Sequence, residues 1–230
     1  MSELDLSGSK IFVRQRQEIA ELLGFETRNK YEIQNSQQVT IGFAAEQQKG
    51  LFGFLLRQFL GHWRTFEVQI FNARRQPYLT CKHPFRFFFQ RFEVYNSSGE
   101  YIGALQQRFA IFSKKFDILD RREMRLFEMA SPLLKMWTFP IRKGNSQYAV
   151  IRKKWSGGFT ELITDKDNFE IDFISPNLEL SHKQIILAAV IFIDLQYFEK
   201  KANSWSIWPS FRTVDPLLSQ TLLYFIYAGP

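Results

Sequence analysis

The sequence predicts an all-β protein with one central helix, a closed antiparallel barrel of about twelve strands around an apolar C-terminal helix. Two observations carry this prediction. A strand–turn–strand pattern recurs along most of the chain. A single apolar run follows it, too long and too uniform to be another strand of the same kind.

The hairpins are predicted from short segments that alternate apolar and polar residues on both sides of a turn. A period of two is the pattern of a strand with one buried face. Asn, Asp, Gly and Ser in the middle tolerate the positive φ that tight turns need. Six hairpins supply about twelve strands, and barrel closure leaves no free edge. The six segments are 31–43, 66–79, 92–103, 116–127, 139–150 and 159–173.

The helix is predicted from the continuous apolar run at residues 185–193. A run that is apolar on all sides is either a core helix or a membrane span. A span needs about 20 apolar residues, and Asp194 and Gln196 interrupt this one. We therefore favour a buried helix over about 179–199, filling a lumen that barrel side chains alone would leave hollow.

Asp194 directly follows the apolar run. One interpretation is a buried, paired carboxylate with a functional role. The other, which we favour, places it at the helix end, where it reaches solvent or an Arg.

The chain divides into three regions. Residues 1–10 are polar and acidic and are predicted to be a flexible N-terminus without a secretory signal, so we expect a cytoplasmic protein. Residues 11–201 form the barrel domain. Residues 202–230 are a C-terminal extension whose apolar stretch, 217–227, is too short to span a bilayer.

Composition narrows the function classes. One cysteine, Cys81, excludes an internal disulfide framework and a cysteine-based zinc cluster. No nucleophile elbow, phosphate-binding glycine loop or HExxH motif is present, so we expect no enzyme. The formal net charge of +7 favours an anionic partner, either nucleic acid or an anionic membrane, or simply a solvated basic surface.

Several motifs resemble the phospholipid scramblase family. They are GFETRNKYEI at 24–33, AAE at 44–46, KWSG at 154–157 and TDKDNF at 164–169, with the ends of the helix run at 193–194 and 198–199. The resemblance covers about residues 11–201. It implies a Tubby-like barrel around a helix and ATP-independent, bidirectional movement of phospholipids between leaflets, usually stimulated by calcium. Tubby-like relatives instead bind phosphoinositides without transport.

The chain departs from that family in its anchors. The proline-rich N-terminal extension of many animal members is missing, and so are the clustered cysteines that carry palmitoyl chains. Apolar segments stand at the cysteine positions, LFGFLL at 51–56 and FRFFF at 85–89. We therefore infer that exposed Leu and Phe side chains replace the acyl chains.

Calcium is the one candidate cofactor. Its candidate ligands are oxygen donors in the acidic segment that the resemblance identifies, which also contains Asn168 and an apparent one-residue insertion before Glu179. The pattern is not an EF-hand, because Glu170 stands where Gly is needed and Pro176 where a bidentate Glu is needed. We favour the alternative, a polar hairpin turn and its strand. The candidate ligands are Asp165, Asp167, Asp172 and Glu179.

The candidate membrane contacts lie in the connectors between hairpins, which an up-and-down barrel gathers at one end. Residues 51–63 show the apolar face of a short interfacial helix, and each basic residue near an anionic surface contributes about 1 kcal/mol. The alternative is that these side chains pack as core under the barrel mouth. The candidates are Leu51, Phe52, Phe54, Phe59, Trp63, Phe87, Phe88, Lys114, Lys115, Lys153, Lys154 and Trp155.

Three hypotheses for the function follow. The first, which we favour, is a phospholipid scramblase-like protein, peripheral or shallowly inserted at a membrane, with anionic lipids as partners and no nucleic acid. The second is an anionic-lipid or phosphoinositide-binding adaptor without transport. The third is a basic nucleic-acid-associated protein. The oligomeric state is not predicted.

Overall fold

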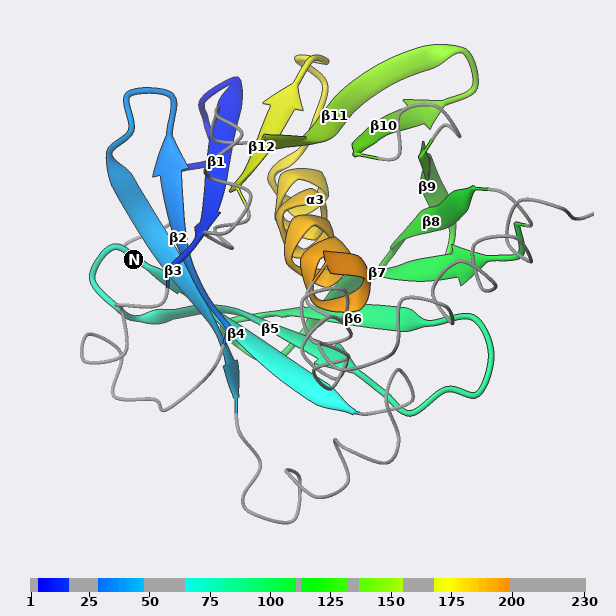
Figure 1. The fold of residues 1–230 in the computed structure, drawn as a ribbon, viewed down its shortest axis with the longest axis horizontal. Coiled ribbons are helices and arrows are strands. Elements are labelled where there is room, and N and C mark those ends of the chain that lie inside the picture. Colours follow the sequence, from blue (N-terminus) through cyan, green and yellow to red (C-terminus); the bar gives the residue numbers. More distant parts are fainter. Residues whose placement is uncertain are drawn as a thin grey trace, which may run out of the picture.

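The computed structural model describes residues 4–16, 29–47, 65–110, 113–131, 137–154 and 168–198. These residues form a closed antiparallel barrel in which each strand pairs with its neighbours in sequence and β12 closes on β1 (Figure 1). The twelve strands are β1 (Lys10–Gln15), β2 (Lys30–Asn35), β3 (Thr40–Gln47), β4 (Phe66–Asn72), β5 (Pro77–His83), β6 (Arg91–Asn96), β7 (Tyr101–Arg108), β8 (Lys114–Asp120), β9 (Arg125–Ser131), β10 (Thr138–Lys143), β11 (Ser146–Lys154) and β12 (Asn168–Phe173).

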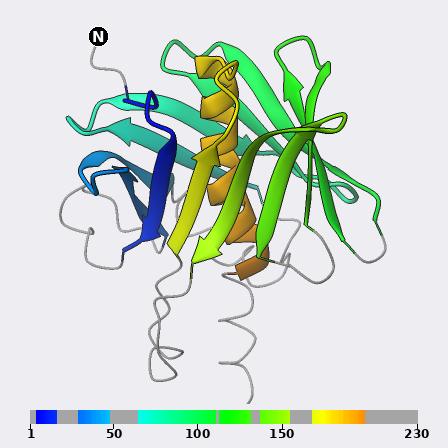
Figure 2. The same ribbon diagram turned by 90° about the horizontal axis from the view of Figure 1, so that it is seen from above.

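A single helix in the described residues runs through the barrel (Figures 1 and 2). Helix α3 (Leu180–Ile193) continues into a π-helical turn, η3 (Asp194–Phe198). Every residue from Ile185 to Ile193 is 0% exposed. The run is apolar on all sides because strands surround it on all sides. The barrel of about twelve strands and the helix within it are thus confirmed. No helix in the described part of the chain has the length and apolarity of a membrane span.

The side chains that alternate toward the inside of each strand fill the space between the central helix and the barrel wall. Inward residues such as Val13, Ile33 and Val68 are fully buried, and each such side chain contributes about 1.5–3 kcal/mol on burial. Gly103 lets β7 approach the helix closely, because a Cβ there would collide with the carbonyl oxygen of Leu119 and lie 2.6 Å from the Cδ1 atom of Ile185. Its φ of +153° is also one that side chains rarely adopt.

Four of the five described hairpin turns are stabilised by the same device. The side-chain oxygen of an Asn or Asp at the start of the turn accepts hydrogen bonds from the backbone N–H groups two and four residues further on. A residue with positive φ follows three positions after it. The starting residues are Asn35, Asn72, Asn96 and Asp120.

The predicted sixth hairpin is corrected by the strand pairing. The sequence predicts that residues 159–163 pair with 169–173. In the structure β12 pairs instead with β11, through Lys154 and Asn168, and with β1, through Val13 and Phe169. Strand β1 therefore takes the place that the predicted strand was to fill, and residues 159–163 lie outside the described residues. Residues 11–13 are all apolar and do not alternate, so only the long-range pairing identifies β1 as a neighbour of β12.

The N-terminal segment contributes to the core. The sequence predicts a flexible segment over residues 1–10, whereas Leu4 and Leu6 are 1% and 2% exposed and pack in the hydrophobic core. The Nζ of Lys183 donates a 2.8 Å hydrogen bond to the carbonyl oxygen of Leu6. This contact ties the segment to the first turn of α3. The extension 202–230 lies outside the described residues.

The topology gives the barrel two different ends. At the turn end lie the hairpin turns and the N-terminus of α3. At the connector end lie the segments that join one hairpin to the next and the C-terminal end of the helix, where Gln196 meets His83 at the end of β5. Those candidate membrane contacts that the structure describes fall at the connector end: Phe87, Phe88, Lys114, Lys115, Lys153 and Lys154.

Candidate functional site

Five exposed phenylalanines gather on two neighbouring loops of the connector end. Four lie between β5 and β6, and the fifth directly follows β7. The loops are adjacent because Arg91 pairs with Gln106, and the N–H of Gln107 donates a 2.8 Å bond to the carbonyl oxygen of Gln90. We call these residues the phenylalanine patch: Phe85 (44% exposed), Phe87 (62%), Phe88 (81%), Phe89 (47%) and Phe109 (74%).

Two of the predicted lysines turn toward aromatic rings at the barrel mouth. The Nζ of Lys114 lies 3.6 Å from the ring centre of Tyr197 in η3, and the Nζ of Lys153 lies 5.4 Å from that of Trp137. Cation–π contacts of this kind hold a charge close to an apolar surface. These two lysines therefore stand at the rim where the helix ends.

The other two predicted lysines point outward from the barrel. Lys115 is exposed and pairs across the strands with Arg108, next to Phe109. Lys154 forms a 3.1 Å ion pair with Glu170. The structure thus brings Phe87 and Phe88 to the same end of the barrel as Lys115. The remaining predicted contacts, Leu51, Phe52, Phe54, Phe59, Trp63 and Trp155, lie outside the described residues.

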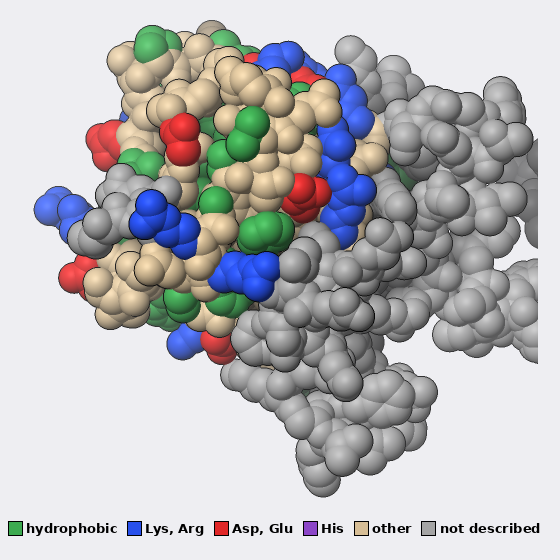
Figure 3. All heavy atoms as spheres, turned by 90° about the vertical axis from the view of Figure 1, so that its left-hand side faces the viewer, with side chains coloured by type: hydrophobic (Ala, Val, Ile, Leu, Met, Phe, Trp, Pro, Cys, Tyr) green, Lys and Arg blue, Asp and Glu red, His purple; other side chains and the backbone are tan. Residues whose placement is uncertain are grey.

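Glu170 is the centre of an ion-pair network on the outer wall. Lys10, Arg152 and Lys154 approach its carboxylate at 3.5, 3.4 and 3.1 Å. Burial opposes ionisation of Glu170, but the hydrogen bond and charge of Lys154, with the charge of Lys10, outweigh it and hold its pKa below the usual value. The side of the barrel seen in Figure 3 shows Lys and Arg side chains gathered in a line beside acidic ones.

The two candidate calcium ligands that the structure describes are both engaged by protein groups. Asp172 lies 3.3 Å from Arg152, on the outer wall. Glu179 is the N-cap of α3, where it forms a capping box with His182. Asp165 and Asp167 lie outside the described residues. Within the part of the chain that the structure describes, no three His, Cys, Asp or Glu side chains lie close enough together to hold a metal ion.

The end of α3 carries a buried polar contact. The hydroxyl of Tyr31 donates a 2.7 Å hydrogen bond to Oδ2 of Asp194, and Asp194 is 1% exposed. The interpretation that Asp194 reaches solvent is therefore wrong. Because the apolar run ends inside the barrel and not at its mouth, the carboxyl group stays enclosed by the wall, where Tyr31 bonds to it.

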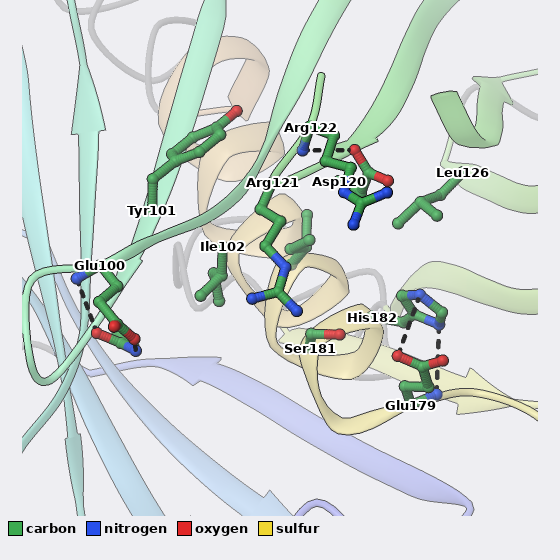
Figure 4. Close-up of a pocket in the computed structure, with 12 residues that line it drawn as sticks. Glu100, Tyr101, Ile102, Asp120, Arg121, Arg122, Leu126, Glu179, Ser181 and His182 are labelled. Atoms are coloured by element: carbon green, nitrogen blue, oxygen red, sulfur yellow. Dashed lines mark hydrogen bonds and ion pairs between the residues drawn. The ribbon is translucent and has the colours of Figure 1, made fainter. Parts of the chain in front are cut away.

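The turn end holds a cavity of about 600 Å³ beside the N-terminus of α3. Figure 4 shows Arg121 extended toward Ser181, with Glu179 and His182 bonded to one another. The carboxylate of Asp120 accepts backbone N–H groups of its own turn. This cavity mixes basic and acidic side chains, and no predicted membrane contact lines it.

The comparisons with known proteins match scramblases over most of the chain. The family model for Scramblase matches residues 3–200. Phospholipid scramblase 2 of Bos taurus is 30% identical over 83% of this chain and 68% of its own length. Phospholipid scramblase 1 of Homo sapiens is 30% identical over 88% and 66%. Phospholipid scramblase family member 5 of Homo sapiens is 27% identical over 86% and 76%.

The match spans every described strand and the central helix. The chain spans about two thirds of the length of the first two relatives. The chain belongs to the scramblase family.

Proposed function

We propose that this protein moves phospholipids between the leaflets of a membrane, in both directions and without ATP, while bound at the cytoplasmic face. The observation that carries this proposal is the family match over residues 3–200, which includes the whole described barrel and its helix. The relatives carry the name phospholipid scramblase, and we extend that activity to this chain.

The filled lumen constrains where lipid could move. Residues Ile185 to Ile193 have no exposed surface, so the helix occupies the space that an open barrel would offer to a lipid. We therefore place the lipid path on the outside of the barrel, at the membrane-facing connector end. Headgroups would pass along protein there while acyl chains stay in the bilayer.

An adaptor that binds anionic lipid without moving it is the second candidate. The same packed lumen favours it, because binding needs only the exposed face of the connector end. The net charge of +7 suits anionic lipid under both candidates. It also suits nucleic acid, with exposed aromatic side chains as stacking surfaces, so the experiments must separate all three.

Translocation is tested in vesicles that contain a fluorescent phospholipid in both leaflets. Dithionite added outside quenches only the label that it can reach. If the protein moves lipid, quenching proceeds past the outer-leaflet fraction, and protein-free vesicles stop there. An adaptor floats with vesicles of phosphatidylcholine and phosphatidylserine but leaves the inner-leaflet label intact. Tight binding of an oligonucleotide, with no flotation, would point to the third function.

A further inference from the structure

We infer that the phenylalanine patch, with the neighbouring cations Arg86 and Lys115, is the surface that docks on an anionic phospholipid bilayer. The inference rests on the proposed function, which puts the protein at a membrane, and it names the described residues that touch lipid. Phe109 extends the surface beyond the segment 85–89 that the sequence alone singles out.

The patch projects from the barrel. Phe88 is 81% exposed and Phe109 is 74% exposed. The rings of Phe85 and Phe87 pack edge to face at 4.9 Å, so they support one another at the surface. Soluble proteins seldom expose contiguous groups of large apolar side chains unless another surface covers them.

Two glutamines hold the β5–β6 loop in this arrangement. The Nε2 of Gln106 donates a 3.1 Å bond to the carbonyl oxygen of Phe89, and the Oε1 of Gln107 accepts a 2.9 Å bond from the N–H of Gln90. Phe89 has a φ of +43°, a conformation that non-glycine residues keep only where the surroundings enforce it. The loop is therefore preorganised to present its rings outward, which reduces the entropy that docking would cost.

The charges beside the patch favour an anionic bilayer. Neither the segment 84–90 nor the segment 109–115 contains Asp or Glu. Arg86 and Lys115 are exposed, and within the described residues no carboxylate pairs with either of them. Bulky aromatics flanked by cations fit the interface of a membrane, where the rings enter the headgroup level and the cations meet lipid phosphate.

The patch is first tested by placing a probe on it. Cys81 is fully buried, and burial raises the pKa of its thiol, so it is unreactive in the folded protein. Phe88→Cys therefore allows an environment-sensitive fluorophore to be attached at the patch. Met124→Cys, 64% exposed at the turn end, is the matched control. On phosphatidylserine-containing vesicles the emission of the label at position 88 should shift to the wavelength typical of apolar surroundings. The emission of the label at position 124 should stay that of a label in water.

Loss of docking is the second test. Phe87→Ser with Phe88→Ser should weaken flotation with vesicles of phosphatidylcholine and roughly 30% phosphatidylserine at least tenfold, because two buried apolar contacts with lipid are lost. The unfolding midpoint should change little, because both side chains are mostly exposed and only Phe87 loses a ring contact, at the surface. Val39→Ser with Met124→Ser, at the turn end, should float like the unsubstituted protein. Arg86→Gln and Lys115→Gln should each weaken binding about fivefold in low salt and little in high salt.

Three outcomes would overturn the inference. The first is unchanged flotation of the double serine variant. The second is an equal emission shift at both probe positions. The third is self-association in solution, without vesicles, that the double serine variant abolishes, which would assign the patch to a second copy of this chain. Docking through the patch without lipid translocation would reject the proposed transport and leave this surface in place.

Discussion

The hydroxyl of Tyr31 on β2 and the carboxyl group of Asp194 meet at 2.7 Å although 163 residues separate them in the chain. Both are buried, at 0% and 1% exposure. Asp194 is the residue at which α3 passes into η3. This bond therefore ties the C-terminal end of the central helix to the barrel wall below the connector end.

Removing the Tyr31 hydroxyl should destabilise the barrel. Tyr31→Phe keeps the ring but leaves Oδ2 of Asp194 without this donor in a site closed to water. We expect a loss of about 1–3 kcal/mol in the free energy of unfolding, measured by urea denaturation. The control is Tyr95→Phe, whose hydroxyl donates a 2.9 Å bond to Glu93 on the outer wall. Water can replace that bond, so equal losses in the two variants would contradict this account.

Gly103 should be intolerant of a side chain. A methyl group at this position would meet the carbonyl oxygen of Leu119 and the side chain of Ile185, on a backbone with φ of +153°. Gly103→Ala should cost about 2–4 kcal/mol, because the helix must move away from β7 and the backbone is strained.

Gly8 provides the comparison for Gly103. The nearest atom to an added Cβ at Gly8 is 3.7 Å away, so Gly8→Ala should change the free energy of unfolding by less than about 0.5 kcal/mol. Urea midpoints measure both variants. A Gly103→Ala protein as stable as Gly8→Ala would mean that α3 does not pack against β7 as the structure has it.

The fold is largely predictable from the sequence because its signals are local. Alternating apolar and polar residues mark strands β2 to β11, and an unbroken apolar run marks the helix. Turn residues such as Asn35 and Asp120 mark the ends of strands. The partner of β12 is not predictable in this way. No tight turn joins β1 to β2, since residues 16–29 separate them, so only the closure of the barrel identifies β1 as the missing strand.

The site is predictable only in part for the same reason. Phe87 and Phe88 stand out in sequence as part of a run of aromatics. Phe109 stands apart from that run, after a polar strand end, and only the register of β6 against β7 places it beside the run. The contact between Asp194 and Tyr31 is also not predictable, because only the folded barrel brings these two distant residues together. The neighbouring lysines Lys114 and Lys115 also point in different directions, because successive residues of a strand face opposite sides of the sheet. Lys114 lies over the ring of Tyr197, and Lys115 is exposed on the outside of the barrel.

Acid should weaken the start of the helix through His182. The N–H of Glu179 donates a 3.3 Å bond to Nδ1 of His182, which requires that nitrogen to be unprotonated. Burial lowers the pKa of His182, and the charge of Lys143 adds to this, although Glu179 and Asp120 oppose it. The unfolded chain therefore takes up the proton first. The contribution of neutral His182 to the free energy of unfolding is complete above the pKa of about 6.5 that His has in the unfolded chain. It declines as the pH falls below that value.

The variant His182→Gln isolates this effect, because Gln at the same position also supports a capping box. Urea midpoints at about pH 7.5 and about pH 5.5 should fall further in the unsubstituted protein than in the variant. The lowered pKa values of Glu32, Glu123 and Glu170 affect stability only as the pH falls below about 4.5, outside this window. An identical fall in both proteins would show that His182 does not titrate in this range.

Calcium should bind weakly or not at all in the absence of lipid. Asp172 is paired with Arg152, and Glu179 caps the helix, so a calcium ion would have to displace both contacts. Titration calorimetry of the lipid-free protein should give no tight binding. Tight binding that is lost in Asp165→Asn with Asp167→Asn would contradict this prediction and restore the segment as a calcium site.

Lipid translocation by this barrel is measured by dithionite quenching of a fluorescent phospholipid in vesicles reconstituted with the protein. We expect label from both leaflets to be quenched in vesicles that contain the folded protein, without ATP, and heat-denatured protein to leave the inner-leaflet label protected. Protected inner-leaflet label in vesicles to which the folded protein is demonstrably bound would contradict the claim that this barrel moves lipid.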